Sequence, residues 1–145
     1  MPLKFNASFA RNALLAIWLG FFVLDLVITF SLYLSDKIGP DNFWAMIQQL
    51  NSLYVTYLGA ILIFFFTSGP PPKNFQPRVR APVILALVCS FFWNFLICIF
   101  LLRLLLEVGT IEDSRAQIGL FGPLLSWFVA PVIGFYFARQ TRGDS

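Results

Sequence analysis

Long apolar runs alternate with short polar segments along this chain. Four runs approach the roughly 20 residues that a helix needs to cross a hydrocarbon core of about 30 Å. They cover residues 12–34, 50–67, 81–106 and 118–138. The apolar part of the second run, 53–67, is short for a span, so we extend this helix backwards. The pattern predicts one all-α domain over residues 1–145, an integral membrane bundle of four transmembrane helices joined by short loops.

The stretch at 40–51, before the apolar part of the second run, carries a helical signal of its own. Pro40 suits the first turn of a helix, where the backbone N–H that proline lacks has no partner in any case. Apolar residues then recur at helical spacing at Phe43, Met46, Ile47 and Leu50. We expect a short helix here that either lies in the outer membrane interface or continues into the second span.

The composition fits a membrane protein and excludes several functions. Hydrophobic residues make up 59% of the chain and charged residues 12%, whereas soluble domains carry about 25% charged residues. The ten lysines and arginines are scattered, so the net charge of +3 predicts no nucleic-acid partner. The chain has no histidine, which excludes histidine-ligated haem, the usual zinc sites and Ser-His-Asp catalysis. We predict no catalytic residues, no metal site and no cofactor, although the apolar surface is compatible with a bound lipid.

Lysine and arginine also indicate how the chain is oriented in a membrane. From the N-terminus onwards, the five segments outside the spans hold two, one, three, one and two basic residues. Basic residues are enriched on the cytoplasmic side of membrane proteins. We therefore predict that both termini and the proline-rich loop at 68–80 face the cytoplasm or its organellar equivalent. The predicted location is a bacterial inner membrane or an organellar membrane.

Small residues occur at every fourth position in two of the spans. The stripes are Gly122, Ser126, Ala130 and Gly134 in the fourth span, and Ala86 and Ser90 in the third. Small side chains let membrane helices approach one another closely. We expect these stripes to pack the helices of one bundle, and a seam for self-association is the alternative.

Three polar residues in the spans call for specific partners. A charge at the centre of a membrane helix costs about 2.5–3.5 kcal/mol on insertion scales, so Asp25 must face protein or water, or carry a proton. Asp25 and Asn94 each lie 13 residues beyond the start of a span, and both spans start on the same side. This equal depth predicts a hydrogen bond between Asp25 and Asn94. Arg103 lies in the last turn of the third span, and we predict that it pairs with Glu107 one turn further on.

Together these features favour a non-catalytic role. One buried acid in a chain without histidine supplies neither an acid–base pair nor a metal site, so we do not expect an enzyme. We expect a subunit, or an accessory or assembly component, of a larger membrane protein complex. Its partners would be the lipid bilayer and other membrane subunits or further copies of the chain. The alternative is a homo-oligomeric ion channel or membrane-permeabilising effector, with Asp25 and Asn94 near the ion pathway.

Overall fold

The computed structural model describes residues 7–67 and 80–142, and these ranges are almost entirely helical. The helices are α1 (Ala7–Leu34), α2 (Pro40–Thr67), α3 (Arg80–Leu105) and α4 (Ile111–Arg142). Within the two ranges no strand occurs, so the prediction of an all-α fold is confirmed. The proline-rich loop that we predicted at 68–80, including Lys73, lies outside the described residues except for its last position.

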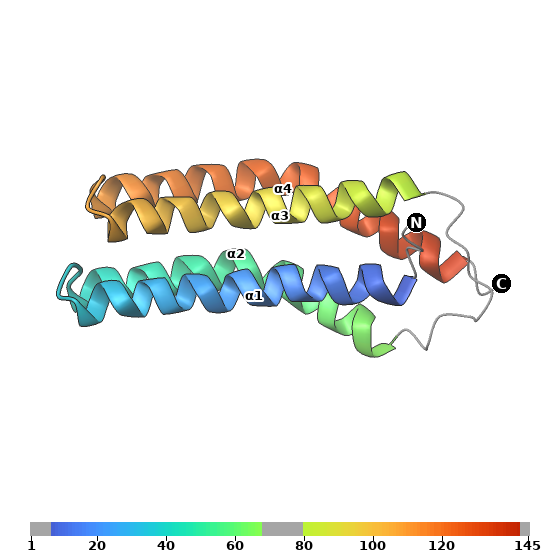
Figure 1. The fold of residues 1–145 in the computed structure, drawn as a ribbon, viewed down its shortest axis with the longest axis horizontal. Helices are drawn as coiled ribbons and strands as arrows, with labels where there is room; N and C mark the ends of the chain where they lie inside the picture. The colour runs from blue at the N-terminus through green and yellow to red at the C-terminus, as the bar shows by residue number, and fades with distance from the viewer. Residues whose placement is uncertain (1–6, 68–79, 143–145) are drawn as a thin grey trace, which may run out of the picture.

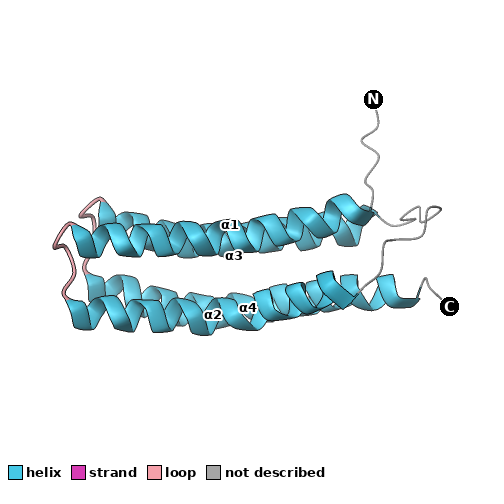
Figure 2. Cartoon of the chain, turned by 90° about the horizontal axis from the view of Figure 1, so that it is seen from below, coloured by secondary structure: helices cyan, strands magenta, loops and turns pink. Residues whose placement is uncertain are grey.

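The helices form two antiparallel hairpins that lie side by side (Figures 1 and 2). α1 packs against α2 within the first hairpin and against α3 of the second, and α3 packs against α4. α2 and α4 also touch, which closes the bundle. α1 and α3 run in the same direction, so α1 begins and α4 ends at one end of the bundle, while the two short connections lie at the other (Figure 1).

Three of the helices are long and apolar enough to cross a membrane. The qualifying segments are Asn12–Leu34 in α1, Pro40–Ile63 in α2 and Val83–Leu105 in α3. They correspond to the first three predicted spans. For α4, the span over 118–138 stays a prediction.

α2 is a single helix of 28 residues that begins at Pro40. The segment 40–51 is therefore the first part of α2 and not a separate interfacial helix. Phe43, Met46 and Leu50 are buried in the bundle core. Because this apolar face packs against other helices, it needs no membrane interface to cover it.

The two short connections share one backbone geometry although their sequences differ. Asp36 follows α1 and Glu107 follows α3, and both adopt the left-handed conformation, with φ of 55° and 61°. In each connection the N–H of the next residue donates to the carbonyl oxygen five positions back, at 3.0 Å and 2.9 Å. These bonds define the Schellman motif, which ends a helix by turning the chain away from its axis.

Glycine in place of Asp36 is expected to stabilise the protein by up to about 1 kcal/mol, because glycine adopts a positive φ without steric cost. The measurement is the free energy of unfolding, obtained by titrating the purified protein with SDS in mixed micelles. Asp41→Gly is the matched control: it also replaces an exposed acid, but inside the first turn of α2, where glycine should destabilise. Equal effects of the two substitutions would contradict this account of the connection.

An aromatic cluster at the centre of the bundle joins all four helices. Trp18 of α1 stacks on Tyr57 of α2, with ring centroids 4.8 Å apart, and lies 5.0 Å from Trp93 of α3. The indole N–H of Trp93 donates to the carbonyl oxygen of Gly122 in α4 at 3.0 Å. A Cβ atom at Gly122 would lie 2.7 Å from the Cδ2 atom of Leu53. Glycine at this position therefore allows α4 to approach α2.

Candidate functional site

A polar cluster lies inside the bundle around Asp25, whose side chain is fully buried. The hydroxyl of Tyr54, on α2, donates a hydrogen bond to Asp25 Oδ2 at 2.6 Å. Asp25 Oδ1 has no hydrogen-bond partner, although the thiol of Cys98, on α3, lies beside the same carboxyl group. Thr29, one turn along α1, is also buried, and its hydroxyl donates to the backbone oxygen of Asp25 at 2.8 Å.

Asn94 lies in the same interior but does not bond to Asp25, so the predicted Asp25–Asn94 hydrogen bond is wrong. The Asn94 amide Nδ2 donates instead to the backbone oxygen of Ser90, one turn back in α3, at 2.7 Å. Its Oδ1 atom has no hydrogen-bond partner, and neither has the hydroxyl oxygen of Ser90. The side chains of Asn94 and Ser90 are both fully buried.

The argument from equal depth nevertheless agrees with the contacts between α1 and α3. Phe21 contacts Phe91, a separation of 91 − 21 = 70 residues, and Lys37 contacts Leu105, a separation of 105 − 37 = 68 residues. These offsets place Asp25 level with residues 93–95, the turn that contains Asn94. The hydrogen bond fails because the amide group finds an acceptor on its own helix and Tyr54 reaches the carboxyl group from α2.

Arg103 does not pair with Glu107, which corrects a second prediction. Arg103 is exposed, and its Nη1 donates to Gln117 Oε1, in α4, at 3.4 Å. α3 ends at Leu105, and Glu107 lies beyond it in the left-handed conformation. The spacing of one helical turn that brings side chains together therefore does not apply to this pair.

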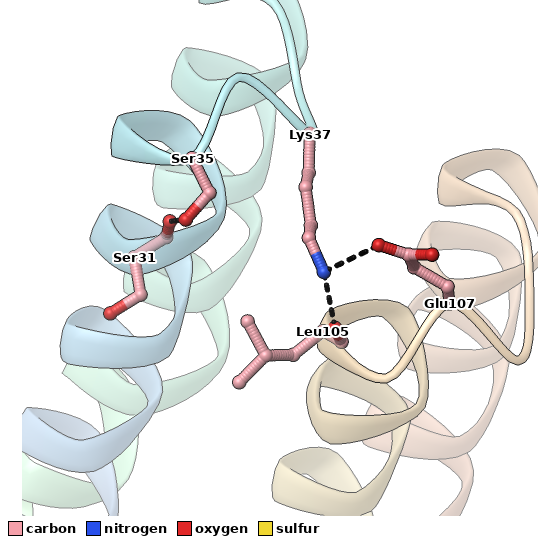
Figure 3. Close-up of polar contacts among 5 residues, drawn as sticks. All are labelled: Ser31, Ser35, Lys37, Leu105 and Glu107. Atoms are coloured by element: carbon pink, nitrogen blue, oxygen red, sulfur yellow. Dashed lines mark hydrogen bonds and ion pairs between the residues drawn. The ribbon is translucent and has the colours of Figure 1, made fainter.

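Glu107 pairs instead with Lys37, across the two connections (Figure 3). Lys37 Nζ lies 2.8 Å from Glu107 Oε1 and donates to the backbone oxygen of Leu105 at 2.7 Å. The last carbonyl groups of a helix have no partner within the helix and carry partial negative charge. Lys37, from the α1–α2 connection, thus caps the end of α3 in the other hairpin.

The Lys37–Glu107 pair is expected to give a small loss of stability in acid that disappears in Glu107→Gln. Hydrogen bonding and charge attraction from Lys37 lower the pKa of Glu107 in the folded protein. A lowered folded pKa means that the stabilisation is present above the ordinary glutamate pKa of about 4.3 and is lost as the pH falls through the folded pKa. The thermal midpoint in detergent, followed from neutral pH into acid, measures this difference.

Because both side chains reach solvent, high salt should shrink the difference between wild type and Glu107→Gln. Identical acid profiles of the two proteins at low salt would show that the pair contributes nothing.

The small-residue stripes separate into buried and exposed parts. Ala86 and Ser90 are buried in α3, and Gly122 is buried in α4. Ser126 is half-buried, whereas Ala130 and Gly134 are exposed. Ala86 and Ser90 of the α3 stripe thus face the bundle interior, whereas the α4 stripe is exposed after its first two members.

Sequence reasoning did not include Tyr54 among the site residues, although it donates the hydrogen bond that holds Asp25. In the described ranges no group of three or more His, Cys, Asp or Glu side chains could hold a metal ion. The chemistry of the cluster therefore rests on one carboxyl group and the neutral amide, hydroxyl and thiol groups around it.

Comparison of this chain with protein-family models, with curated proteins and with solved structures finds no match.

Proposed function

We propose that this chain is an integral membrane protein in which all four helices cross the bilayer. Large apolar side chains are exposed on the outward faces of every helix. Examples are Leu24 and Val27 in α1, Trp44 and Val55 in α2, Val88 and Phe92 in α3, and Leu120 and Trp127 in α4. Asp25, Thr29, Ser90 and Asn94 have the opposite placement, because they are fully buried in the interior. This inside-out polarity supports a bundle whose outer surface meets lipid or other membrane helices.

We further propose that both termini face the cytoplasm or its organellar equivalent, in a bacterial inner membrane or an organellar membrane. The distribution of basic residues supports this orientation, and the two short connections then lie on the opposite side. Single cysteines at Asp36, Glu112 and Lys73, in a background without Cys89 and Cys98, test it with a membrane-impermeant maleimide. We expect labelling of positions 36 and 112 from outside, and of position 73 after lysis. The reverse pattern would invert the topology.

Within the membrane, the proposed function is that of a non-catalytic subunit, or an accessory or assembly component, of a larger membrane protein complex. The observation that carries it is the pairing of an inward polar cluster with outer faces on which large apolar side chains are exposed along every helix. The Asp25 cluster lies inside one chain, and the apolar side chains on the outside form a surface for contact with other helices. In a bilayer, the helices of neighbouring subunits associate by close packing of their faces. The exposed helix faces of this chain are available for such contacts.

The test is purification of the chain from its native membrane in a mild detergent, followed by mass measurement and identification of bound chains. We expect stoichiometric co-purification with other membrane subunits, and no ion conductance when the purified chain is placed in planar bilayers. A homo-oligomer without other subunits that conducts ions, with the current lost in Asp25→Asn, would overturn the subunit proposal. That result would support the channel or permeabilising effector.

A further inference from the structure

Among the residues that the structure describes, three oxygen atoms in the bundle interior have no hydrogen-bond partner. They are Asp25 Oδ1, Asn94 Oδ1 and Ser90 Oγ, and each of the three residues has a relative exposure of 0%. Buried polar atoms are normally satisfied, and an unsatisfied one costs about 1–3 kcal/mol. The contacts between α1 and α3 place Asp25 level with Asn94, so Asp25 Oδ1 and Asn94 Oδ1 lie where one ligand accepts lone pairs from both, with Ser90 one turn back in α3.

The charge around Asp25 points to the same conclusion. The groups that face its carboxyl group are the Tyr54 hydroxyl on α2 and the Cys98 thiol on α3, and α4 does not pack against α1. The basic side chains that the structure describes, Lys37, Arg103 and Arg115, make their contacts in or near the two connections at one end of the bundle. None of these charges can neutralise a carboxylate in the bundle centre.

We propose that Asp25 and Asn94 form an internal binding site for one small monovalent cation, H⁺ or Na⁺, with the Ser90 hydroxyl at its edge. Carboxylate, amide carbonyl and hydroxyl oxygens are the ligands that hard cations prefer. One carboxylate balances one positive charge, so a monovalent ion leaves the interior neutral, whereas a divalent ion would leave a net charge there. A proton bonded to Asp25 and a Na⁺ ion coordinated by it neutralise the same carboxylate, so H⁺ and Na⁺ compete.

Tyr54 is a positioning residue in this site. Its hydrogen bond holds Asp25 Oδ2 toward α2, which leaves Oδ1 for the cation on the side of α3. This inference goes beyond the proposed subunit function and does not depend on it, because a bound cation can stabilise the bundle whatever its partners are.

The test uses the full chain in nanodiscs of neutral lipid, with tryptophan fluorescence as the readout. Trp18 and Trp93 contact the ring of Tyr54 at 6.0 Å and 5.4 Å, so they report on the cluster. Substitution of phenylalanine for the exposed Trp44 and Trp127 removes the background signal. Each sample is titrated with acid at several NaCl concentrations, with choline chloride keeping the ionic strength constant.

We expect a fluorescence transition with pH, and its midpoint should move to lower pH as the Na⁺ concentration rises. The transition should be lost in Asp25→Asn, a substitution that keeps a hydrogen-bond acceptor for Tyr54. Asn94→Ala should weaken Na⁺ binding by at least about tenfold. Asp41→Asn, which removes an exposed acid of α2, is the matched control and should behave as wild type. A transition that Na⁺ does not move would show that the site takes H⁺ alone and would overturn Na⁺ binding there.

A wild-type signal that responds to neither ion, or a response that Asp25→Asn retains, would overturn the proposal. If Asp25→Asn does not fold, infrared difference spectra of the wild type test the proposal instead, because they distinguish a protonated from an ionised carboxyl group. The carboxylic acid band must appear on acidification and be suppressed by Na⁺, or appear at neutral pH if H⁺ is the occupant. Spectra that show a carboxylate insensitive to both ions would contradict the site.

Discussion

Replacing Trp93 with alanine is expected to lower the free energy of unfolding by about 3–5 kcal/mol. Trp93 is 1% exposed, contacts the rings of Trp18 and Tyr54, and donates to the Gly122 carbonyl oxygen at 3.0 Å. Its removal leaves a cavity where all four helices meet, and close packing is the main force between helices in a membrane. SDS titration in mixed micelles measures the loss.

Trp127→Ala is the matched control, because this tryptophan is 81% exposed on the outer face of α4. Its loss should change the free energy of unfolding by no more than about 0.5 kcal/mol. Comparable losses at the two positions would mean that the aromatic cluster does not organise the bundle. Trp93→Phe should fall between them, since it keeps most of the ring and loses the hydrogen bond.

Tyr54→Phe is expected to cost about 1–3 kcal/mol, although it removes a single oxygen atom. The substitution preserves the ring contacts and leaves the fully buried Asp25 carboxyl group without its 2.6 Å hydrogen bond. In the bundle interior, the other donor beside this carboxyl group among the described residues is the Cys98 thiol, which is a weak donor and cannot replace the hydroxyl. The readout is again unfolding in mixed micelles.

Tyr57→Phe provides the comparison, because Tyr57 stacks on Trp18 and does not bond to Asp25. A double-mutant cycle with Asp25→Asn separates the hydrogen bond from other effects of each change. We expect Tyr54→Phe to cost less once Asp25 has been replaced. Additive losses would show that the two side chains are not energetically coupled.

The helices of this fold could be predicted from the sequence because their signal is distributed over many residues. A long, mainly apolar run still predicts a helix if any single position in it is changed. The ends of the first two predicted spans coincide with the ends of α1 at Leu34 and α2 at Thr67. The shared geometry of the two connections could not be predicted in this way. It is carried by backbone hydrogen bonds at Asp36 and Glu107, and neither position is the glycine that usually marks such a turn.

In the candidate site, too, some features could be predicted from the sequence and others could not. The burial of Asp25 follows from the free-energy cost of placing a charge in a membrane helix. Its equal depth with Asn94 follows from the helical rise per residue. Both depend only on position in the sequence. The choice of Tyr54 as hydrogen-bond donor depends on how α2 is rotated about its axis, which no spacing along the chain specifies. One signal was available: side chains lean toward the N-terminus of their own helix, which lets Tyr54 reach back along α2 toward the connection. The partner of Glu107 was predicted wrongly because α3 ends two residues before Glu107, so helical spacing does not apply to it.

Lys37 also has a consequence for how the two hairpins are aligned along the bundle axis. It fastens the connection of one hairpin to the end of α3 in the other, while Trp18 and Trp93 make a second contact between the hairpins in the interior. A slide of one hairpin past the other by a single helical turn, about 5.4 Å, would break both contacts at once. Either contact by itself would allow one hairpin to rock against the other. Because the two contacts lie far apart along the bundle axis, together they hold the hairpins in one register.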